Sequence, residues 1–261
     1  METCQLSKNS LKLTKNFWCL LIRSSKSGKS TFLSSLIKHK NEVFQEPGNS
    51  TFILCSPNLG DPTFTAPSDL QFQERLQEWA KPAQILFFNK IISEEELFSH
   101  ADATNGRLLL MVDDFSMEIM ADPLVYKLFS RLSSHSSIDT CLSLHQGTKS
   151  GTGKFYPLVN ENANFKVQFR NISNREAIGI MSRKMFPYGG NHLQKCLNIA
   201  TDICGSFAYV CINASLKNEL NNEFGVRTNI FGENDLPMLL FKNPKSYDKR
   251  YWINYKSENK S

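Results

Sequence analysis

A short segment near the start of the chain, residues 26–31 (Lys-Ser-Gly-Lys-Ser-Thr), lies between an apolar run at 17–22 and an amphipathic stretch at 32–38. This order predicts a β-strand, a tight turn and an α-helix. The first N–H groups of a helix have no acceptor within the helix, and the helix dipole is positive at that end, so such a turn favours an anion. We therefore expect this turn to bind the phosphates of a nucleoside triphosphate, here taken as ATP.

The residue types in this turn indicate how each residue would bind phosphate or Mg²⁺. The segment from Ser27 to Thr31, with Gly28 at its centre, is expected to surround the phosphates. Lys29 can reach the β- and γ-phosphates, and the Ser30 hydroxyl can hold Mg²⁺. The full motif has a glycine where this chain has Arg23. A surface turn that arose by chance is therefore the alternative.

A second motif begins with the apolar run at residues 108–112, which reads as a strand buried on both faces. Asp113 and Asp114 follow it, at the end where parallel sheets bind ligands. We expect Asp113 to bind the Mg²⁺ and Asp114 to accept a proton from the attacking water. The alternative is that the two acids only cap the next helix, since aspartate is a favourable N-cap residue.

A third strand, at residues 140–144, is followed by His145 and Gln146. The Gln146 amide can accept from water and donate to phosphate, so this residue could orient the water against the γ-phosphate. An ordinary loop amide is the alternative. A lone histidine beside a strand end is more often structural.

The remaining pattern alternates strands and helices. Further strands are expected at 51–56, 85–88, 165–170 and 207–212, the one at 165–170 half-exposed, and helices at 70–79, from Ser93, from Asp122 and at 193–204. This predicts an α/β fold, a three-layer P-loop NTPase sandwich around a mainly parallel sheet. The strand at 51–56 falls between the two motifs in sequence, which indicates the additional-strand class of ATPases. We expect an ATPase domain at 1–240 and a basic, aromatic tail at 241–261.

The composition of the chain bears on which partners it can bind and on its location in the cell. The net charge of +5 suits nucleic acid without requiring it. The seven cysteines form no Cys-x-x-Cys pair, so zinc and disulfide frameworks are not expected, and Cys19, Cys55, Cys141 and Cys211 read as buried thiols. No apolar run approaches the ~20 residues of a membrane span. Without a signal-peptide pattern, an intracellular location is expected, with no membrane partner.

The region from about residue 108 to 231 resembles the genome-packaging ATPases of the FtsK–HerA clan found in double-stranded DNA viruses, virophages and Polinton-like elements. The matching segments, in the same order, are Val112-Asp113-Asp114, Leu128-Phe129, Ser134-His135, Leu144-His145-Gln146, Asn162-Ala163-Asn164-Phe165, Phe169-Arg170-Asn171, Met185-Phe186-Pro187 and Arg227-Thr228-Asn229-Ile230-Phe231.

The resemblance implies a homo-oligomeric ring that moves double-stranded DNA, with a capsid component as a further partner. It implies a location in the host cytoplasm or nucleus, or with the virion. It also supports the roles given above to Lys29, Ser30, Asp113, Asp114 and Gln146. In such rings an arginine of one subunit faces the neighbour's γ-phosphate.

This chain departs from the family at that arginine, because Pro157 stands at the usual position. The trans-acting charge could come from another residue: Arg131, Arg170, Arg175 or Lys154. Together with Arg23, this change leaves a second hypothesis open, a nucleotide-binding or structural subunit with weakened catalysis. A small P-loop kinase is a third hypothesis, although no arginine-rich lid is evident.

Overall fold

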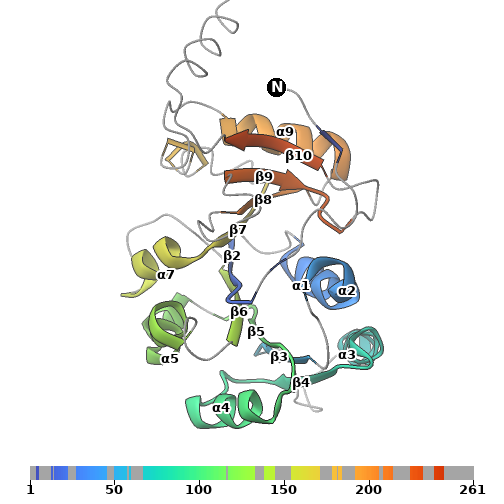
Figure 1. Ribbon diagram of the computed structural model, residues 1–261, viewed down its shortest axis with the longest axis vertical. Helices are drawn as coiled ribbons and strands as arrows, with labels where there is room; N and C mark the ends of the chain where they lie inside the picture. The colour runs from blue at the N-terminus through green and yellow to red at the C-terminus, as the bar shows by residue number, and fades with distance from the viewer. Residues whose placement is uncertain are drawn as a thin grey trace, which may run out of the picture.

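The computed structural model of this chain describes residues 4–5, 13, 15–22, 28–45, 50–57, 59, 67–115, 117–132, 138–144, 154–170, 178–180, 182–183, 192–205, 208–213, 224–231 and 238–243. These residues form one ten-stranded sheet with the strand order β1-β10-β9-β8-β7-β2-β6-β5-β3-β4. Helices cover both faces of the sheet (Figure 1). The expected three-layer α/β architecture is confirmed.

One half of the sheet is parallel. Its strands, in spatial order, are β7 (Phe165–Phe169), β2 (Trp18–Ile22), β6 (Ile138–Leu144), β5 (Leu108–Val112), β3 (Thr51–Cys55) and β4 (Gln84–Phe88). All residues of β3, β5 and β6 are buried. Near-continuous apolar runs form such strands because helices exclude water from both faces.

The other half is antiparallel and extends from β7. Its strands are β8 (Tyr209–Asn213), β9 (Phe224–Thr228), β10 (Met238–Asn243) and β1 (Cys4–Gln5). The sequence predicted β8 but not β9, β10 or β1. Strand β10 also crosses the expected domain boundary at residue 240, so the first residues of the presumed tail belong to the sheet.

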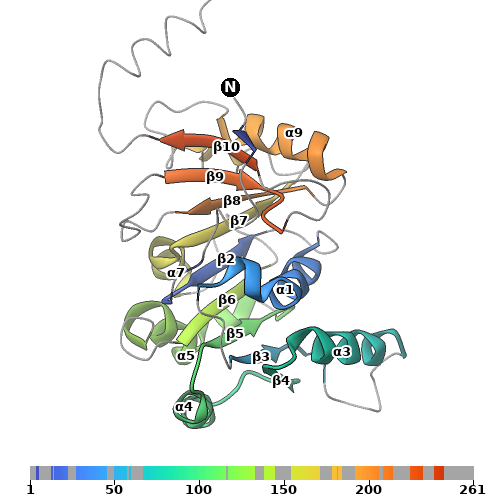
Figure 2. The same ribbon diagram turned by 45° about the vertical axis from the view of Figure 1, so that its right-hand side comes forward.

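Two layers of helices cover opposite faces, as Figures 1 and 2 show. On one face lie α1 (Lys29–Lys38), α2 (Lys40–Val43) and α3 (Pro67–Ala80). On the other lie α4 (Glu94–Ala103), the 3₁₀ turn η1 (Met117–Ala121), α5 (Pro123–Lys127), the π-helical turn η2 (Leu128–Leu132) and α7 (Tyr156–Asn162). No helix within the described ranges is long and apolar enough to cross a bilayer.

The last helix, α9 (His192–Cys204), packs on the antiparallel half. Val210 and Ile212 of β8 contact it, whereas Cys211 between them belongs to the core beneath α1. Because side chains alternate along a strand, α9 covers the face of β8 opposite to the α1 side. The antiparallel half therefore has its own buried cluster.

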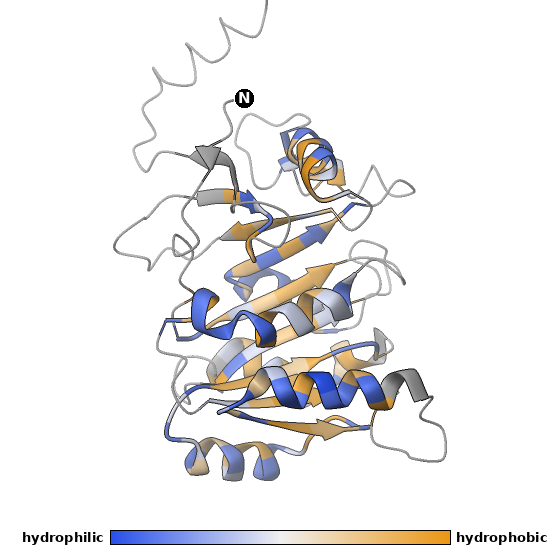
Figure 3. Cartoon of the chain, turned by 90° about the vertical axis from the view of Figure 1, so that its right-hand side faces the viewer, coloured by the Kyte–Doolittle hydropathy of each residue, from blue (hydrophilic) through white to orange (hydrophobic). Residues whose placement is uncertain are grey.

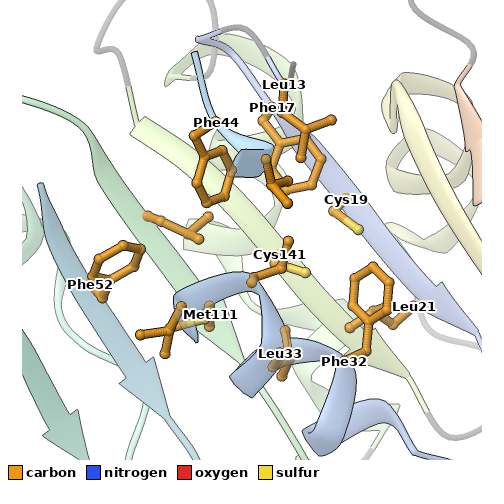
Figure 4. Close-up of a cluster of buried hydrophobic side chains, with 14 of the residues drawn as sticks. Leu13, Phe17, Cys19, Leu21, Phe32, Leu33, Phe44, Phe52, Met111 and Cys141 are labelled. Atoms are coloured by element: carbon orange, nitrogen blue, oxygen red, sulfur yellow. The ribbon is translucent and has the colours of Figure 1, made fainter. Parts of the chain in front are cut away.

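The core beneath α1 and α3 joins helix and strand side chains. Figure 4 shows Phe32 and Leu33 of α1 in the same cluster as Leu21, Met111 and Cys141 of the sheet. Figure 3 shows the same division by hydropathy, with hydrophobic strands behind helices that carry many hydrophilic residues. The amphipathic pattern after the Gly-Lys-Ser turn thus fixes which face of α1 meets the sheet.

Predicted helix starts are confirmed where caps were identified. The Ser93 side chain accepts a hydrogen bond from the Glu96 N–H at 3.2 Å, and Asp122 accepts from the Leu124 N–H at 2.7 Å. Helix α3 begins at Pro67, earlier than the predicted 70–79. These caps satisfy backbone donors that the first turn of a helix leaves without acceptors.

The strand at 165–170 corrects an expectation. Its alternation of apolar and polar residues predicted a half-exposed strand, yet β7 is buried at every residue except Lys166, which is half-buried. The reason is that β7 lies between β2 and β8. Gln168 is accommodated because its amide donates to the carbonyl of Phe169 at 2.9 Å.

The strand inserted between the two motif strands is also not the one that sequence order indicated. In the sheet, β6 lies between β2 and β5, while β3 lies beyond β5. The additional strand is therefore the one at 138–144. Sequence order alone could not show this, because a parallel strand can join either side of its predecessor.

A buried ion pair joins the amino ends of the parallel strands. Arg107 donates through Nε to Asp139 and through Nη1 to the Leu13 carbonyl at 2.9 Å. The other oxygen of Asp139 accepts from the Phe17 N–H at 2.7 Å. Burial raises the pKa of Asp139, and the guanidinium of Arg107 opposes that effect. This network lies at the end of the sheet opposite to the carboxyl ends of the strands.

The predicted burial of Cys19, Cys55, Cys141 and Cys211 is confirmed, and Cys196 is buried as well. Within the described ranges, neither these five cysteines nor Cys204 forms a disulfide. Burial raises the pKa of Cys55 to about 11 and that of Cys196 to about 12. These thiols fill the core as small apolar side chains.

Candidate functional site

Helix α1 follows β2 in the chain and begins after Gly28. Gly28 is the N-cap of α1 and has φ 91° and ψ 13°, a left-handed conformation that favours glycine. The Phe32 N–H donates to the Gly28 carbonyl at 2.8 Å, which closes the first helical turn. A helix therefore begins directly after this glycine, as the sequence predicted, and presents its amino end at the carboxyl edge of the sheet.

The carboxyl ends of β2 and β6 are also where the chain leaves the sheet in two directions. The chain leaves β2 into α1 on one face, and after β6 it enters α7 on the opposite face. Neighbouring strands with this divergence form a topological switch point, which is where open α/β sheets bind ligands. Gly28 and Lys29 lie at this point.

Lys29 is 6% exposed and extends from the first turn of α1 toward the end of β6. Its Nζ lies 3.5 Å from the carbonyl oxygen of Leu144, the last residue of β6. Because β6 ends at the carboxyl edge of the sheet, this contact holds the ammonium group at the same edge as the amino end of α1.

Ser30 and Asp113 are in direct contact. The Ser30 hydroxyl donates to Oδ2 of Asp113 at 2.6 Å, across 83 positions of sequence. Asp113 immediately follows β5, and its own N–H donates to the Cys55 carbonyl at 2.9 Å, which continues the ladder between β5 and β3. The helix start and the strand end that the sequence singled out are therefore together.

The second oxygen of Asp113 suits a cation. Oδ1 is buried and has no hydrogen-bond partner among the described residues. A buried carboxylate oxygen without a donor is costly, and Mg²⁺ prefers a carboxylate, hydroxyl and phosphate oxygens as ligands. Within the described ranges, no group of three or more His, Cys, Asp or Glu side chains forms a metal site. The donor set fits a magnesium ion held jointly by this protein and a bound phosphate.

Asp114 differs from its neighbour. It is exposed and has φ 60°, a left-handed conformation that is uncommon for most residues other than glycine but that aspartate adopts more often than others. Of the two acids, Asp113 turns toward α1. Asp113 does not serve as the helix cap that the alternative proposed, because its carboxylate accepts a hydrogen bond from Ser30. The cap of α5 is Asp122.

Several predicted site residues lie outside the described residues, namely Ser27, Arg23, His145, Gln146 and Arg175. Thr31 lies within the described residues, in the first turn of α1, and is exposed. The roles of all these residues in binding and catalysis stay predictions.

Three of the four candidates for the trans-acting charge, namely Arg131, Lys154 and Arg170, lie within the described residues. Arg170 follows β7 at the carboxyl edge, and its N–H donates to the Ala208 carbonyl at 3.0 Å. Lys154 lies over the Phe155 ring, 5.4 Å from its centroid. Arg131 falls within η2. The structure brings Arg170 to the same edge of the sheet as Lys29, on the strand next to β2.

One residue at this edge was missed by sequence reasoning. Ser143 lies in β6, is 1% exposed, and has a hydroxyl without a hydrogen-bond partner among the described residues. The sequence contains a feature that could have indicated Ser143, since this polar residue interrupts the apolar run of the strand just before its end. Its position beside Asp113 became evident only from the register of β5 and β6.

No protein-family model matches this chain, and no curated protein matches it. Among solved structures, it is similar to EssC (ATPases 2 and 3) from Geobacillus thermodenitrificans, with a TM-score of 0.42 and 12% sequence identity. The match covers 93% of this chain and 43% of that chain, so the chain spans less than half the length of that structure.

Proposed function

We propose that this chain is a Mg²⁺-dependent ATPase that couples ATP hydrolysis to the translocation of double-stranded DNA, in the packaging of a viral or mobile-element genome. The observation that carries the nucleotide part is the 2.6 Å hydrogen bond from Ser30 to Asp113. It joins the start of α1, which follows the proposed phosphate-binding turn, to the carboxylate that such a turn requires for its metal ion.

Each predicted site residue has a task in the proposal. Lys29 neutralises charge on the β- and γ-phosphates, and the backbone N–H groups at the amino end of α1 donate hydrogen bonds to the phosphates. Ser30 and Asp113 hold Mg²⁺, which would neutralise charge that develops on the phosphates. Asp114 accepts a proton from the attacking water, and Gln146 orients that water.

The DNA part of the proposal is supported by the sequence resemblance to packaging ATPases and by the net charge of +5. In a homo-oligomeric ring, a cation from a neighbouring subunit would complete each site. Arg131, Arg170, Arg175 and Lys154 are the candidates for that cation. A capsid component as partner, and a location in the host cytoplasm or nucleus or with the virion, belong to the same proposal.

Phosphate release tests the proposal. We expect the purified chain to release phosphate from ATP in the presence of Mg²⁺, and duplex DNA to stimulate the rate. Lys29→Ala should abolish this turnover. Lys38→Ala, at the other end of α1, is the matched control and should retain it, since Lys38 is exposed and lies near Trp79. Wild-type turnover no higher than that of Lys29→Ala, with DNA present, would count against the proposal.

A second candidate function is a nucleotide-binding subunit with weakened catalysis. The observation that favours it is Pro157, which occupies the family's arginine position and lies in the first turn of α7. Proline is well tolerated there because the first helical N–H has no acceptor in the helix. The position thus has a structural use in this chain. Assembled rings that bind ATP tightly without releasing phosphate would favour this function over the first.

A further inference from the structure

Two buried polar atoms at the carboxyl edge have no hydrogen-bond partner among the described residues. One is Oδ1 of Asp113, in a residue 6% exposed, and the other is the hydroxyl of Ser143, in a residue 1% exposed. An unpaired polar group in a buried position is costly, and most native proteins avoid it. Two such atoms near one another call for a common explanation.

Strand register brings these two residues together. Met111 of β5 pairs with Cys141 of β6, and Val112 pairs with Leu142. The next pair in the same register is Asp113 and Ser143. Adjacent strands lie about 4.8 Å apart, so neighbouring side chains on the same face can meet.

Both side chains point to the α1 face. Met111 and Cys141 belong to the core beneath α1, as Figure 4 shows, and side chains two positions further along a strand return to the same face. Ser143 also pairs with Leu21 of β2, another residue of that core. Independently, the Oδ2 atom of Asp113 accepts a hydrogen bond from Ser30 of α1, which places this carboxylate on the α1 face.

We propose that Ser143 is a positioning residue of this site. When nucleotide and a divalent cation are bound, its hydroxyl donates to one lone pair of Oδ1 of Asp113 and leaves the other lone pair for the cation, while Oδ2 accepts from Ser30. The two hydroxyls hold the carboxylate in one orientation toward the cation. A serine hydroxyl reaches a new acceptor by a change of rotamer, without a backbone movement. The inference rests on the proposed nucleotide function.

Metal sites commonly depend on such outer partners. Groups that hydrogen-bond a ligating carboxylate fix its orientation, and their loss typically lowers metal affinity about 10- to 100-fold. The same strand supplies a comparison. Thr140 of β6 also has a buried hydroxyl without a partner among the described residues, but it lies three positions earlier, away from Asp113. Thr140 alternates with Cys141 and therefore points to the opposite face of the sheet.

The experiment measures binding of a fluorescent, non-hydrolysable ATP analogue while Mg²⁺ is titrated, and again in excess EDTA. The variants are Ser143→Ala and, as the matched control, Thr140→Val. We expect Ser143→Ala to raise the Mg²⁺ concentration for half-maximal binding about 10-fold or more, with affinity in EDTA within about twofold of wild type. Thr140→Val should change neither value. Thermal unfolding establishes that both variants are folded, since loss of an unpaired buried hydroxyl is expected to be near neutral.

The outcomes separate this inference from the proposed function. Wild-type binding with an unchanged Mg²⁺ midpoint in Ser143→Ala would overturn the role of Ser143 and leave the nucleotide function standing. An equal loss of affinity with and without Mg²⁺ would also overturn it, because that pattern indicates general packing. Wild-type protein that binds no analogue would refute the proposed function, and the inference with it.

Discussion

The hydroxyl of Ser30 donates a hydrogen bond to Oδ2 of Asp113 at 2.6 Å, although the two residues are 83 positions apart. Ser30 belongs to the first turn of a helix, and Asp113 directly follows a buried strand. Their contact joins the start of α1 to the end of β5, and β6 lies between β2 and β5 in the sheet. The proposed nucleotide site depends on that junction.

The conformation of Gly28 predicts a specific cost for a side chain there. At φ 91°, an added Cβ is strained, so Gly28→Ala should lower stability by about 1–2 kcal/mol and weaken nucleotide binding by displacing the start of α1. Gly205 is the matched control. It has φ 68°, and a Cβ built there meets nothing within 4 Å.

Gly205→Ala should therefore show a comparable loss of stability with unchanged nucleotide affinity. Urea unfolding and titration with a fluorescent ATP analogue measure the two quantities. If both variants lost affinity to the same degree, the conformation of Gly28 would have no special part in binding.

The Arg107–Asp139 pair predicts a pH-dependent defect. Arg107→Met leaves a buried carboxylate without its cation and should cost about 3–5 kcal/mol at neutral pH. Burial already raises the pKa of Asp139, and removal of Arg107 takes away the main effect that lowers it. The folded variant then gains a proton more readily than the unfolded chain, so the defect should shrink as the pH falls toward the raised pKa.

Urea unfolding of wild type and Arg107→Met at pH 8 and pH 5 measures this dependence. The double variant Arg107→Met/Asp139→Leu is the control, because it removes both charges and should recover much of the lost stability. A defect of Arg107→Met that was equal at both pH values would contradict the assignment.

The buried thiols predict a loss of stability in alkali. Burial raises the pKa of Cys55 from 9.0 to about 11 and that of Cys196 to about 12. When the pKa of a thiol is higher in the folded protein than in the unfolded chain, the free energy of unfolding does not change with pH below the pKa of the unfolded chain. Above pH 9 the unfolded chain loses these protons more readily, so stability falls as the pH rises, by on the order of 3 kcal/mol from Cys55 alone by pH 11.

The free energy of unfolding in urea between pH 7 and pH 10.5 tests this. We expect it to decline above about pH 9, and more gently in Cys55→Ala, whatever the cost of that substitution at pH 7. An equal decline in both proteins would show that the Cys55 thiol does not titrate as described.

The parallel half of the fold was predictable because it depends on local signals. Apolar runs gave β2, β3 and β5, caps gave the starts of α4 and α5, and the carboxyl edge followed from parallel strand direction. The proximity of Ser30 and Asp113 could therefore be expected from the sequence alone. Strands β9 and β10 could not, because their pattern is short and their stability depends on pairing with β8 and with each other.

The buried ion pair and Ser143 escaped prediction for a related reason. Arg107 directly precedes β5 and Asp139 lies in β6, and nothing in either segment indicates that those strands become neighbours. Ser143 has meaning only beside Asp113, which again requires the register of the same two strands. Sequence patterns identified the elements and the groups within them, while tertiary pairing decided which buried polar groups meet.

The most direct test of the central claim is the nucleotide affinity of wild type and Asp113→Asn, measured by calorimetry with Mg²⁺ and with EDTA. Wild type should bind ATP at least about tenfold more tightly with Mg²⁺ than without it, and Asp113→Asn should lose this gain while its affinity in EDTA is retained. If Asp113→Asn kept the full Mg²⁺-dependent gain, the carboxylate beside Ser30 would not face the metal, and the proposed nucleotide site would be refuted.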